Sequence, residues 1–321
     1  MLAAMHLDTP LISAAPALFT EHDQVWLKMD CWQNAGSFKQ RGVGRLVQEA
    51  VHNGAKAIVC ASGGNAGFAA VYAAQACGVP VTIVLPGNSS LSARQAIAAR
   101  GAQTIVHGDT WDQAHAFATQ LAPQQGAAYV HPFDHPALWA GHATIIDEVV
   151  STGTPFDCVI ASVGGGGLLA GIVQGLHNHG LQHIPVIAVE TLGADSLHQS
   201  LLAGERITLP AITSIAATLG ARQVAQHAFE LAREHRVISL TVTDAQAVQA
   251  CLRFADAHRV LVEPACGAAL AALSVHAQRL KEFRAPLIEV CGGIGVTFGQ
   301  LKQWEQQFEQ ASSRSPIKSP T

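Results

Sequence analysis

The chain has few charged residues and no cluster of one sign. Of its 321 residues, 13% are charged and 49% are hydrophobic, and the formal net charge is -4. This balance is typical of a chain that buries much of itself, as α/β enzymes with covered sheets do, and it excludes extensive disorder. Because no basic stripe is available for phosphate backbones, we expect no nucleic-acid partner.

Long hydrophobic runs and CxxC pairs are also missing, and we expect no leader sequence. No stretch approaches the ~20 apolar residues that span a bilayer, and the start, MLAAMHLDTPLISAAPALF, has no positively charged segment. We therefore expect a cytoplasmic protein without membrane association. The seven cysteines include no CxxC pair. Neither a disulfide framework nor a zinc cage is predicted, and most cysteines should be small core residues.

Short β-branched runs alternate with alanine-rich stretches along most of the chain. This alternation predicts an α/β fold with mostly parallel sheets. Asp244 is expected to cap the helix that follows a strand at residues 237–242. The other strands are expected at residues 57–60, 81–85, 104–106, 158–161, 186–189 and 287–291.

The length of the chain predicts two lobes that share a cleft. The alternation is interrupted at HPFDHP (131–136), and a second crossing between the lobes is expected near Gly36. The C-terminal residues are polar and lack periodicity, which predicts a frayed end. The predicted units are a large domain of residues 1–36 and 137–310, a small domain of residues 37–136, and a flexible tail, 311–321.

Lys39 lies in a loop-to-helix segment, Asn34-Ala-Gly-Ser-Phe-Lys-Gln-Arg-Gly42. A lysine that forms a Schiff base must reach a carbonyl from a fixed position. Its amine must also lose a proton easily, which desolvation or a nearby cation such as Arg41 promotes. A single lysine is weak support for such a site, because an ordinary solvated helix lysine is the commoner case. Lys39 is therefore a candidate that depends on its surroundings.

A run of four glycines, Gly164 to Gly167, follows a predicted strand and precedes a predicted helix. Its amides and the helix N-terminus would enclose a phosphate dianion. The alternative is a close-packed turn, although four glycines cost more backbone entropy than a simple turn requires. The same segment satisfies G-x-G-x-x-A, and Glu190 ends the next strand, so a nicotinamide-dependent oxidoreductase is the rival interpretation.

Two further strand ends open on glycine turns. Ser62-Gly-Gly-Asn-Ala-Gly67 offers amides and side-chain donors to a small carboxylate at a positive helix end, or it is a simple capped turn. Cys291-Gly-Gly-Ile-Gly295 places a thiol at the rim of the same cleft, or a small buried hydrophobic residue. Neither turn by itself decides between its two interpretations.

Together and in this order, these segments resemble the fold-type II pyridoxal-phosphate family, and most closely its cytosolic serine dehydratases that also act on threonine. Membership implies a two-lobed, three-layer α/β/α fold like that of the tryptophan synthase β subunit, and a homodimer. The similarity covers nearly the whole chain. It runs through Leu27-Lys-Met-Asp30, Gly36-Ser-Phe-Lys39, Ser162-Val-Gly-Gly-Gly-Gly-Leu-Leu169, Val186-Ile-Ala-Val-Glu190, Val262-Glu-Pro-Ala-Cys-Gly267 and Val290-Cys-Gly-Gly293.

The resemblance also implies a role for individual residues. Lys39 matches the Schiff-base lysine, which later removes the Cα proton, and Phe38 matches the ring that stacks on the pyridine. Asn65 matches the partner of the cofactor's ring hydroxyl, and Cys291 matches the partner of its pyridine nitrogen. The implied phosphate cup is Gly164, Gly165, Gly166, Gly167 and Leu168, the substrate site is Ser62, Gly63, Gly64, Asn65 and Ala66, and a monovalent-cation site, for K+, is Glu190, Ala194 and Ser196.

The implied reaction is the pyridoxal-phosphate-dependent elimination of ammonia from L-serine, which yields pyruvate, and from L-threonine, which yields 2-oxobutanoate. A thiol rather than a carboxylate at the ring nitrogen favours elimination over transamination or racemisation. Serine racemisation is the alternative within the family, with Ser62 as the second acid or base. A ligand sensor without turnover is the non-enzymatic alternative.

Two features depart from the family pattern or lie outside it. Gly63 replaces the alanine of the liver-type motif, which we expect to loosen the pocket and to broaden the choice of substrate. We interpret His131, His135 and His142 as surface or cleft-rim residues rather than metal ligands, because no cysteine or acid completes a ligand set.

Overall fold

The computed structural model of the protein describes residues 4–19, 22, 24–87, 89 and 91–314. Within them, the larger of two sheets has six strands in the order β1-β2-β10-β7-β8-β9. Only the pairing of β1 with β2 is antiparallel. The strands are β1 (Leu11–Ser13), β2 (Trp26–Lys28), β7 (Cys158–Ser162), β8 (Val186–Thr191), β9 (Val237–Val242) and β10 (Pro286–Glu289).

The smaller sheet has four parallel strands in the order β5-β4-β3-β6. Every residue of β3 and β4 is buried, which is typical of parallel strands that are covered on both faces. The strands are β3 (Ile58–Ala61), β4 (Val81–Leu85), β5 (Gln103–Val106) and β6 (Ala128–Val130).

Helices pack on both sheets. Those of the smaller part are α1 (Lys39–His52), α2 (Asn65–Ala76), α3 (Leu91–Ala98) and α4 (Trp111–Gln124). The remaining helices are α5 (Pro136–Ser151), α6 (Gly167–Asn178), α7 (Ser196–Ala203), α8 (Gln226–Glu234), α9 (Asp244–His258), α10 (Pro264–Val275), α11 (Ala277–Leu280) and α12 (Phe298–Arg314), with the 3-10 helices η1 (Asp30–Trp32) and η2 (Ala217–Leu219).

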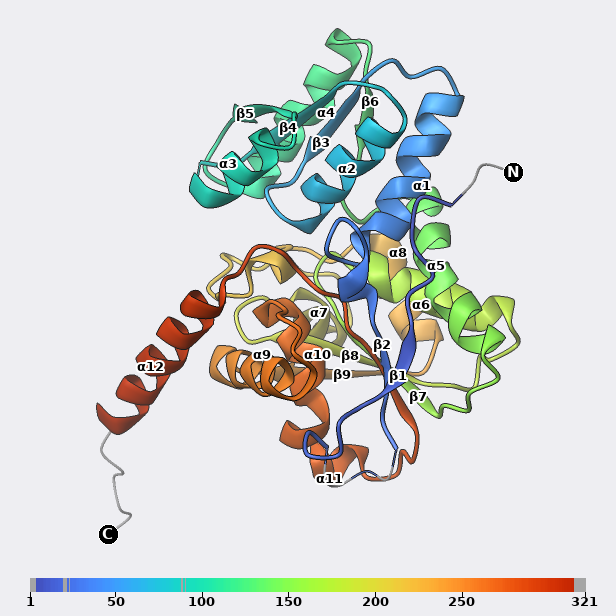
Figure 1. Ribbon diagram of the computed structural model, residues 1–321, viewed down its shortest axis with the longest axis vertical. Coiled ribbons are helices and arrows are strands. Elements are labelled where there is room, and N and C mark those ends of the chain that lie inside the picture. Colours follow the sequence, from blue (N-terminus) through green and yellow to red (C-terminus); the bar gives the residue numbers. More distant parts are fainter. Residues whose placement is uncertain (1–3, 20–21, 23, 88, 90, 315–321) are drawn as a thin grey trace.

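The two sheets form two distinct parts of the molecule. Figure 1 shows the smaller sheet with α2, α3 and α4 in the upper part and the larger sheet in the lower part. Helices α1 and α5 pack against each other where the two parts meet, and α12 extends away from the body. Parallel strands present their carboxyl ends at one edge, so both sheets can offer strand-to-helix turns to a shared cleft.

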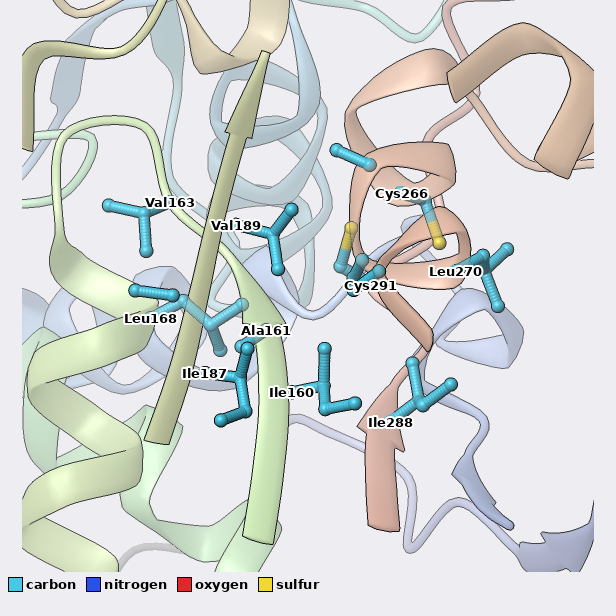
Figure 2. Packing of buried hydrophobic residues seen from close by; sticks show 14 of the residues in the cluster. Ile160, Ala161, Val163, Leu168, Ile187, Val189, Cys266, Leu270, Ile288 and Cys291 are labelled. Atoms are coloured by element: carbon cyan, nitrogen blue, oxygen red, sulfur yellow. The ribbon is translucent and has the colours of Figure 1, made fainter. Parts of the chain in front are cut away.

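The main hydrophobic core lies beneath these turns, around the larger sheet. Figure 2 shows Ile160 of β7, Ile187 of β8 and Ile288 of β10 side by side, with Leu270 of α10 packed near them. All four side chains are buried. This core gives the turns at the ends of β7 and β10 a rigid base.

The predicted α/β fold with mostly parallel sheets is confirmed. Each predicted strand is present, and β9 spans Val237–Val242 as expected. The cysteines are free, and five of the seven are buried, as predicted.

The predicted cap of α9 is wrong. Thr243, not Asp244, is the N-cap, and it forms a capping box with Gln246. Asp244 instead accepts hydrogen bonds from Ser214 Oγ at 2.5 Å and from the Ile215 amide at 3.1 Å. A tertiary contact to the loop before η2 therefore decides the role of this aspartate.

The two expected crossings between the lobes lie in loops of the structure, and the expected tail is partly helical. Gly36 lies in the loop before α1, residues 131–135 connect β6 to α5, and Pro136 begins α5. Domain boundaries drawn at these points stay predictions. Helix α12 includes residues 311–314 of the expected tail, and residues 315–321 lie outside the described residues. Within the described ranges, no helix combines the length and apolar character needed to cross a membrane.

Candidate active site

Lys39 is the first residue of α1, and its amine is held by the loop after β6. Nζ donates a hydrogen bond to the carbonyl oxygen of Pro132, 2.7 Å away. Desolvation lowers the pKa of the amine from 10.5 to about 8, and the thiols of Cys60 and Cys291 oppose this shift. An amine with this pKa releases its proton near neutral pH far more readily than a solvated lysine.

Arg41 does not lower the pKa of Lys39. Its guanidinium is buried and hydrogen-bonded to the carboxylates of Asp30 and Glu148, which compensate its charge. Of the two causes considered from the sequence, desolvation acts on Lys39, and the nearby cation does not.

The tetraglycine turn is closely packed. A Cβ on Gly165 would lie 2.3 Å from Cγ of Phe133, and a Cβ on Gly166 would lie 2.3 Å from Cβ of Ala228. Gly166 also has a φ of +91°, in the left-handed region that favours glycine. A Cβ on Gly167 would lie 2.5 Å from the Phe133 oxygen, so steric contact alone accounts for three of the four glycines.

The same turn leaves the start of α6 open to a ligand. Gly166 is the N-cap, and no side chain caps the helix. The first amides of a helix lack intrahelical partners and carry partial positive charge, which suits a phosphate. The Leu168 side chain is buried in the main core (Figure 2), so its amide is the part available to such a ligand.

The turn from Ser62 to Ala66 is a second helix start without a side-chain cap. Helix α2 begins at Asn65 after Gly64. Ser62 Oγ accepts a hydrogen bond from the Gly64 amide at 3.3 Å, and Ala66 packs in the core of the smaller part. The uncapped amides at this helix start suit a carboxylate.

Gly63 faces the smaller sheet. A Cβ at this position would lie 2.9 Å from Cδ2 of Leu85 and 3.0 Å from Oγ of Ser89. The methyl group that this chain lacks would therefore point at the end of β4 and the loop beyond it.

Asn65 is hydrogen-bonded to Glu263, a residue for which the sequence predicted no role. Asn65 Nδ2 donates to Oε1 of Glu263 at 2.7 Å, and Thr218 Oγ1 donates to the same oxygen at 2.6 Å. Desolvation raises the pKa of Glu263 from 4.5 to about 7, and the two hydrogen bonds oppose this shift. The only signal in the sequence is one acid within an otherwise apolar helix start, Val262-Glu-Pro-Ala265.

Cys291 lies beside Cys266 of α10, as Figure 2 shows. A hydrogen bond with Cys266, together with desolvation, raises the pKa of the Cys291 thiol well above 9.0. The thiol is therefore neutral. The following Gly292 has a φ of +91°, and its Cα lies so close to Gly36 that a Cβ would be 2.5 Å from the Gly36 oxygen. The thiol turn thus packs on the segment that carries Lys39.

Phe38 precedes Lys39 and is 8% exposed. The centroid of its ring is 5.0 Å from Nζ of Lys39 and 4.9 Å from the ring centroid of His142. His142 is fully buried, and neither of its ring nitrogens has a hydrogen-bond partner within the described residues. The interpretation of His142 as a surface or cleft-rim residue is therefore wrong.

His131 and His135 organise the loop between β6 and α5. Nδ1 of His131 accepts a hydrogen bond from the Asp134 amide at 2.8 Å, and Nδ1 of His135 accepts one from the Ala137 amide at 3.1 Å. Both nitrogens are thus occupied by the backbone of their own loop.

Glu190, Ala194 and Ser196 meet at the start of α7. The Glu190 carboxylate is buried and accepts hydrogen bonds from the Leu197 amide at 3.0 Å and the His198 amide at 2.7 Å. These bonds to the start of α7 account for the acid at the end of β8 without the ribose that the nicotinamide interpretation requires. Ser196 Oγ is buried and has no partner within the described residues, which leaves one oxygen for a cation to satisfy.

A series of contacts joins the four predicted segments into one site. Each contact is a hydrogen bond or an approach that leaves little or no room for a Cβ atom. Lys39, the tetraglycine turn, the Ser62–Ala66 turn and the Cys291 turn are therefore neighbours in the folded chain. In order, the contacts are Lys39 to Pro132, Phe133 to Gly165, Gly164 to Leu219, Thr218 to Glu263, Glu263 to Asn65, and Glu263 to Gly293.

The side chains present fit pyridoxal phosphate. The desolvated amine of Lys39 suits its aldehyde, the uncapped start of α6 suits its phosphate, and the Phe38 ring suits its pyridine. The Asn65 amide and the neutral Cys291 thiol provide polar groups of the kind that a ring hydroxyl and a ring nitrogen require.

Comparisons with known proteins also point to enzymes that use pyridoxal phosphate. A sequence model of the family described as pyridoxal-phosphate dependent enzyme matches residues 3–292. The chain is 43% identical to the mouse (Mus musculus) protein named serine dehydratase-like, with 94% of this chain and 95% of that protein covered. It is 42% identical to the human (Homo sapiens) L-serine dehydratase/L-threonine deaminase, with 95% and 96% covered.

A solved structure is similar over almost the whole fold. The fungal L-serine ammonia-lyase from Rhizomucor miehei superposes with a TM-score of 0.89 and is 32% identical in sequence. The alignment covers 95% of this chain and 100% of the fungal chain.

Proposed function

The chain belongs to the family of pyridoxal-phosphate dependent enzymes, and from this premise we propose that it eliminates ammonia from L-serine to yield pyruvate. By the same steps L-threonine yields 2-oxobutanoate. The proposal depends above all on the setting of the Lys39 amine. Its pKa is lowered to about 8, and it donates a hydrogen bond to the carbonyl oxygen of Pro132, beside the tetraglycine turn. The names of the mouse, human and fungal relatives support serine and threonine as substrates.

In this proposal the cofactor is held by Lys39, Phe38, Asn65, Cys291 and the amides of the turn from Gly164 to Leu168. When bound, pyridoxal phosphate supplies an electron-poor ring that takes up the electron pair left at Cα. The amides of the turn bind its phosphate, and Asn65 binds its ring hydroxyl. Cys291 offers a neutral thiol to the ring nitrogen, which favours elimination over racemisation.

The chain's own groups orient the substrate and move its proton. Ser62 and the amides of residues 62–66 bind the substrate carboxylate at the positive end of α2. The amine of Lys39 then takes the Cα proton, because its lowered pKa leaves a substantial unprotonated fraction near neutral pH. The Cβ hydroxyl then leaves, and with the proton taken up by Lys39 it makes one molecule of water. The aminoacrylate that remains hydrolyses to pyruvate and ammonia.

Formation of the two keto acids tests the proposal. Wild type should produce pyruvate from L-serine and 2-oxobutanoate from L-threonine. Lys39→Ala should lose at least about a thousandfold in activity, since it removes both the cofactor anchor and the base. Lys56→Ala, at an exposed lysine of the same part, is the matched control. Full activity of Lys39→Ala would overturn the assignment.

Two further measurements separate the alternatives. Borohydride treatment of wild type should leave a reduced pyridoxyl group on Lys39, which neither a nicotinamide enzyme nor an empty fold would acquire. Ammonia release from L-serine excludes a sensor without turnover. D-serine formed in excess of pyruvate would instead identify a racemase, with Ser62 as the second acid or base.

We also propose a K+ site at Glu190, Ala194 and Ser196, supported by the unpartnered buried oxygen of Ser196. Activity should then be higher in K+ than in a matched buffer of tetramethylammonium, and Ser196→Ala should reduce the difference. A cytoplasmic homodimer is proposed from the family resemblance, and sedimentation analysis would test its oligomeric state.

A further inference from the structure

Glu263 occupies the N-cap position of α10 but does not cap the helix. Its φ and ψ are -87° and 164°, and its side chain makes no capping hydrogen bond. The next residue, Pro264, has no amide proton to offer at the helix start. The carboxylate is turned away from its own helix.

The two side-chain hydrogen bonds of Glu263 reach segments that are distant in sequence. Asn65 at the start of α2 donates to Oε1 over 2.7 Å, and Thr218 of η2 donates to the same oxygen over 2.6 Å. Glu263 is 4% exposed and Asn65 is 7% exposed, so solvent competes little for these bonds. One carboxylate therefore connects the smaller part of the molecule to two segments of the larger part.

The carboxylate also lies against the turn that follows Cys291. A Cβ on Gly293 would lie 2.1 Å from Cδ of Glu263 and 2.3 Å from its Oε2, and Gly293 has a φ of +116°. Glu263 is thus enclosed between Asn65, the proposed partner of the ring hydroxyl, and the turn of the proposed partner of the ring nitrogen.

The burial of Glu263 is not compensated by an ion pair within the described residues. Desolvation raises its pKa to about 7 against the two hydrogen bonds. The ionisable groups near it are thiols, Cys291 on the turn and Cys251 of α9, and its charge acts on both of them. A buried carboxylate without a cation lowers stability, so stability alone does not favour this residue.

The hydrogen bond selects one orientation of the Asn65 amide. Oε1 accepts hydrogen bonds from both Thr218 Oγ1 and Asn65 Nδ2, so it faces the amino side of the amide. The flipped amide would place Oδ1 against Oε1, two acceptors in contact. Nδ2 carries a second proton, which remains available for another acceptor in the cleft.

We propose that Glu263 is a positioning residue, which orients Asn65 so that its remaining amide proton is donated to the ring hydroxyl of pyridoxal phosphate. This inference rests on the proposed function, which puts that cofactor on Lys39 and its hydroxyl at Asn65. Glu263 acts through Asn65, and its carboxylate contributes by the direction in which it holds the amide.

Cofactor affinity and the visible absorption maximum of the holoenzyme test this role. In Glu263→Gln the side-chain oxygen can still accept from Asn65 and Thr218, so affinity should stay within about threefold of wild type. Glu263→Ala leaves the amide without its partner, and affinity should fall about tenfold, as is usual when a supporting partner of a ligand-binding residue is removed. Its absorption maximum should also shift. Asp157→Asn, at a carboxylate that accepts hydrogen bonds from the Arg284 and Ala285 amides before the start of β10, is the matched control and should change neither quantity.

A double-mutant cycle with Asn65→Ala separates positioning from a general structural effect. If Glu263 acts through Asn65, Glu263→Ala should add no further loss of cofactor affinity in the Asn65→Ala protein. Additive losses, or unchanged affinity and absorption in Glu263→Ala, overturn the proposal. Should Glu263→Ala not fold, Glu263→Met replaces it, because it keeps the volume and removes the acceptor.

The outcomes also separate this role from the proposed function. Wild-type protein in which borohydride fixes no pyridoxyl group to Lys39 contradicts the proposed function. Wild-type protein that is labelled on Lys39, beside a Glu263→Ala protein indistinguishable from it, contradicts the positioning role alone.

Discussion

The guanidinium of Arg41 and the carboxylate of Asp30 are joined by two hydrogen bonds in the interior of the protein. Nε lies 2.6 Å from Oδ2, and Nη2 lies 2.7 Å from Oδ1. The two residues are 1% and 0% exposed. The guanidinium also binds Glu148 of α5, so this network joins η1, α1 and α5 two residues beyond Lys39.

Asp30→Asn should destabilise the fold strongly. The change removes one negative charge from a buried network and leaves the Arg41 guanidinium poorly compensated, which costs about 3–5 kcal/mol when one member of a buried pair is lost. Urea unfolding of both proteins measures the difference. Glu49→Gln breaks an exposed ion pair with Arg45 and should cost less than about 0.5 kcal/mol. Equal effects of the two changes would contradict the role of burial.

Gly166→Ala should weaken cofactor binding, whereas Gly180→Ala should not. The two glycines lie at opposite ends of α6, with φ values of +91° and +71°. Left-handed backbone destabilises the folded state by about 1–2 kcal/mol at each of the two alanines. Only at Gly166 does the new Cβ also meet a neighbour, at 2.3 Å from Cβ of Ala228, while nothing lies within 4 Å at Gly180.

Titration with pyridoxal phosphate and urea unfolding distinguish these two effects. A displaced turn no longer directs the amides at the start of α6 towards the phosphate. We therefore expect the affinity of Gly166→Ala to fall at least tenfold, which is a loss of roughly 1.4 kcal/mol or more of binding free energy. Gly180→Ala should lose stability without losing affinity. Unchanged affinity in both variants would contradict the proposed phosphate turn.

The reactivity of Lys39 in cofactor-free protein should level off near pH 8. Only the neutral amine reacts with an acylating reagent, and desolvation lowers its pKa from 10.5 to about 8. The rate should therefore rise about tenfold per pH unit below pH 8 and become constant above it. Mass spectrometry of the Lys39 peptide between pH 6 and pH 10 measures the rate, with Nα-acetyl-lysine in the same solutions as reference. A rate that keeps rising through pH 10 excludes the lowered pKa.

Gly63→Ala should shift substrate preference from threonine towards serine. The new methyl would meet Leu85 at 2.9 Å and Ser89 at 3.0 Å, so the turn carrying Ser62 must move slightly towards the cleft. Threonine has one methyl group more than serine, and such a group is worth about 1–3 kcal/mol of discrimination. We expect kcat/KM for threonine to fall roughly tenfold relative to serine. An unchanged ratio would show that Leu85 and Ser89 absorb the methyl group without moving the turn.

The strands and glycine turns could be predicted from the sequence because their causes are local. A β-branched run such as Val81–Leu85, bounded by turn residues, indicates a buried strand from its own pattern. The glycines at 164–167 mark a turn for the same reason, since left-handed backbone and close approach both depend on the absent Cβ. The segments that carry the proposed site could therefore be recognised in the sequence, together with the candidate Lys39.

The chemical setting of each side chain could not be predicted in this way. The bond from Asn65 to Glu263 spans 198 residues of chain, and nothing near either residue indicates the other. Asp244 follows the usual pattern of a helix cap, yet its contact with Ser214 draws it away and leaves the cap to Thr243. His142 looks like a polar residue and is completely buried beside Phe38.

The sequence by itself determined the parallel α/β architecture, the positions of the turns and the family to which the chain belongs, because these follow from periodicity and from short motifs. Only the tertiary structure decided that Arg41 is neutralised by Asp30 and Glu148, that desolvation lowers the pKa of Lys39, and that Glu263 holds Asn65. Burial and pairing depend on which segments the folded chain brings together, and that is a property of the packed molecule.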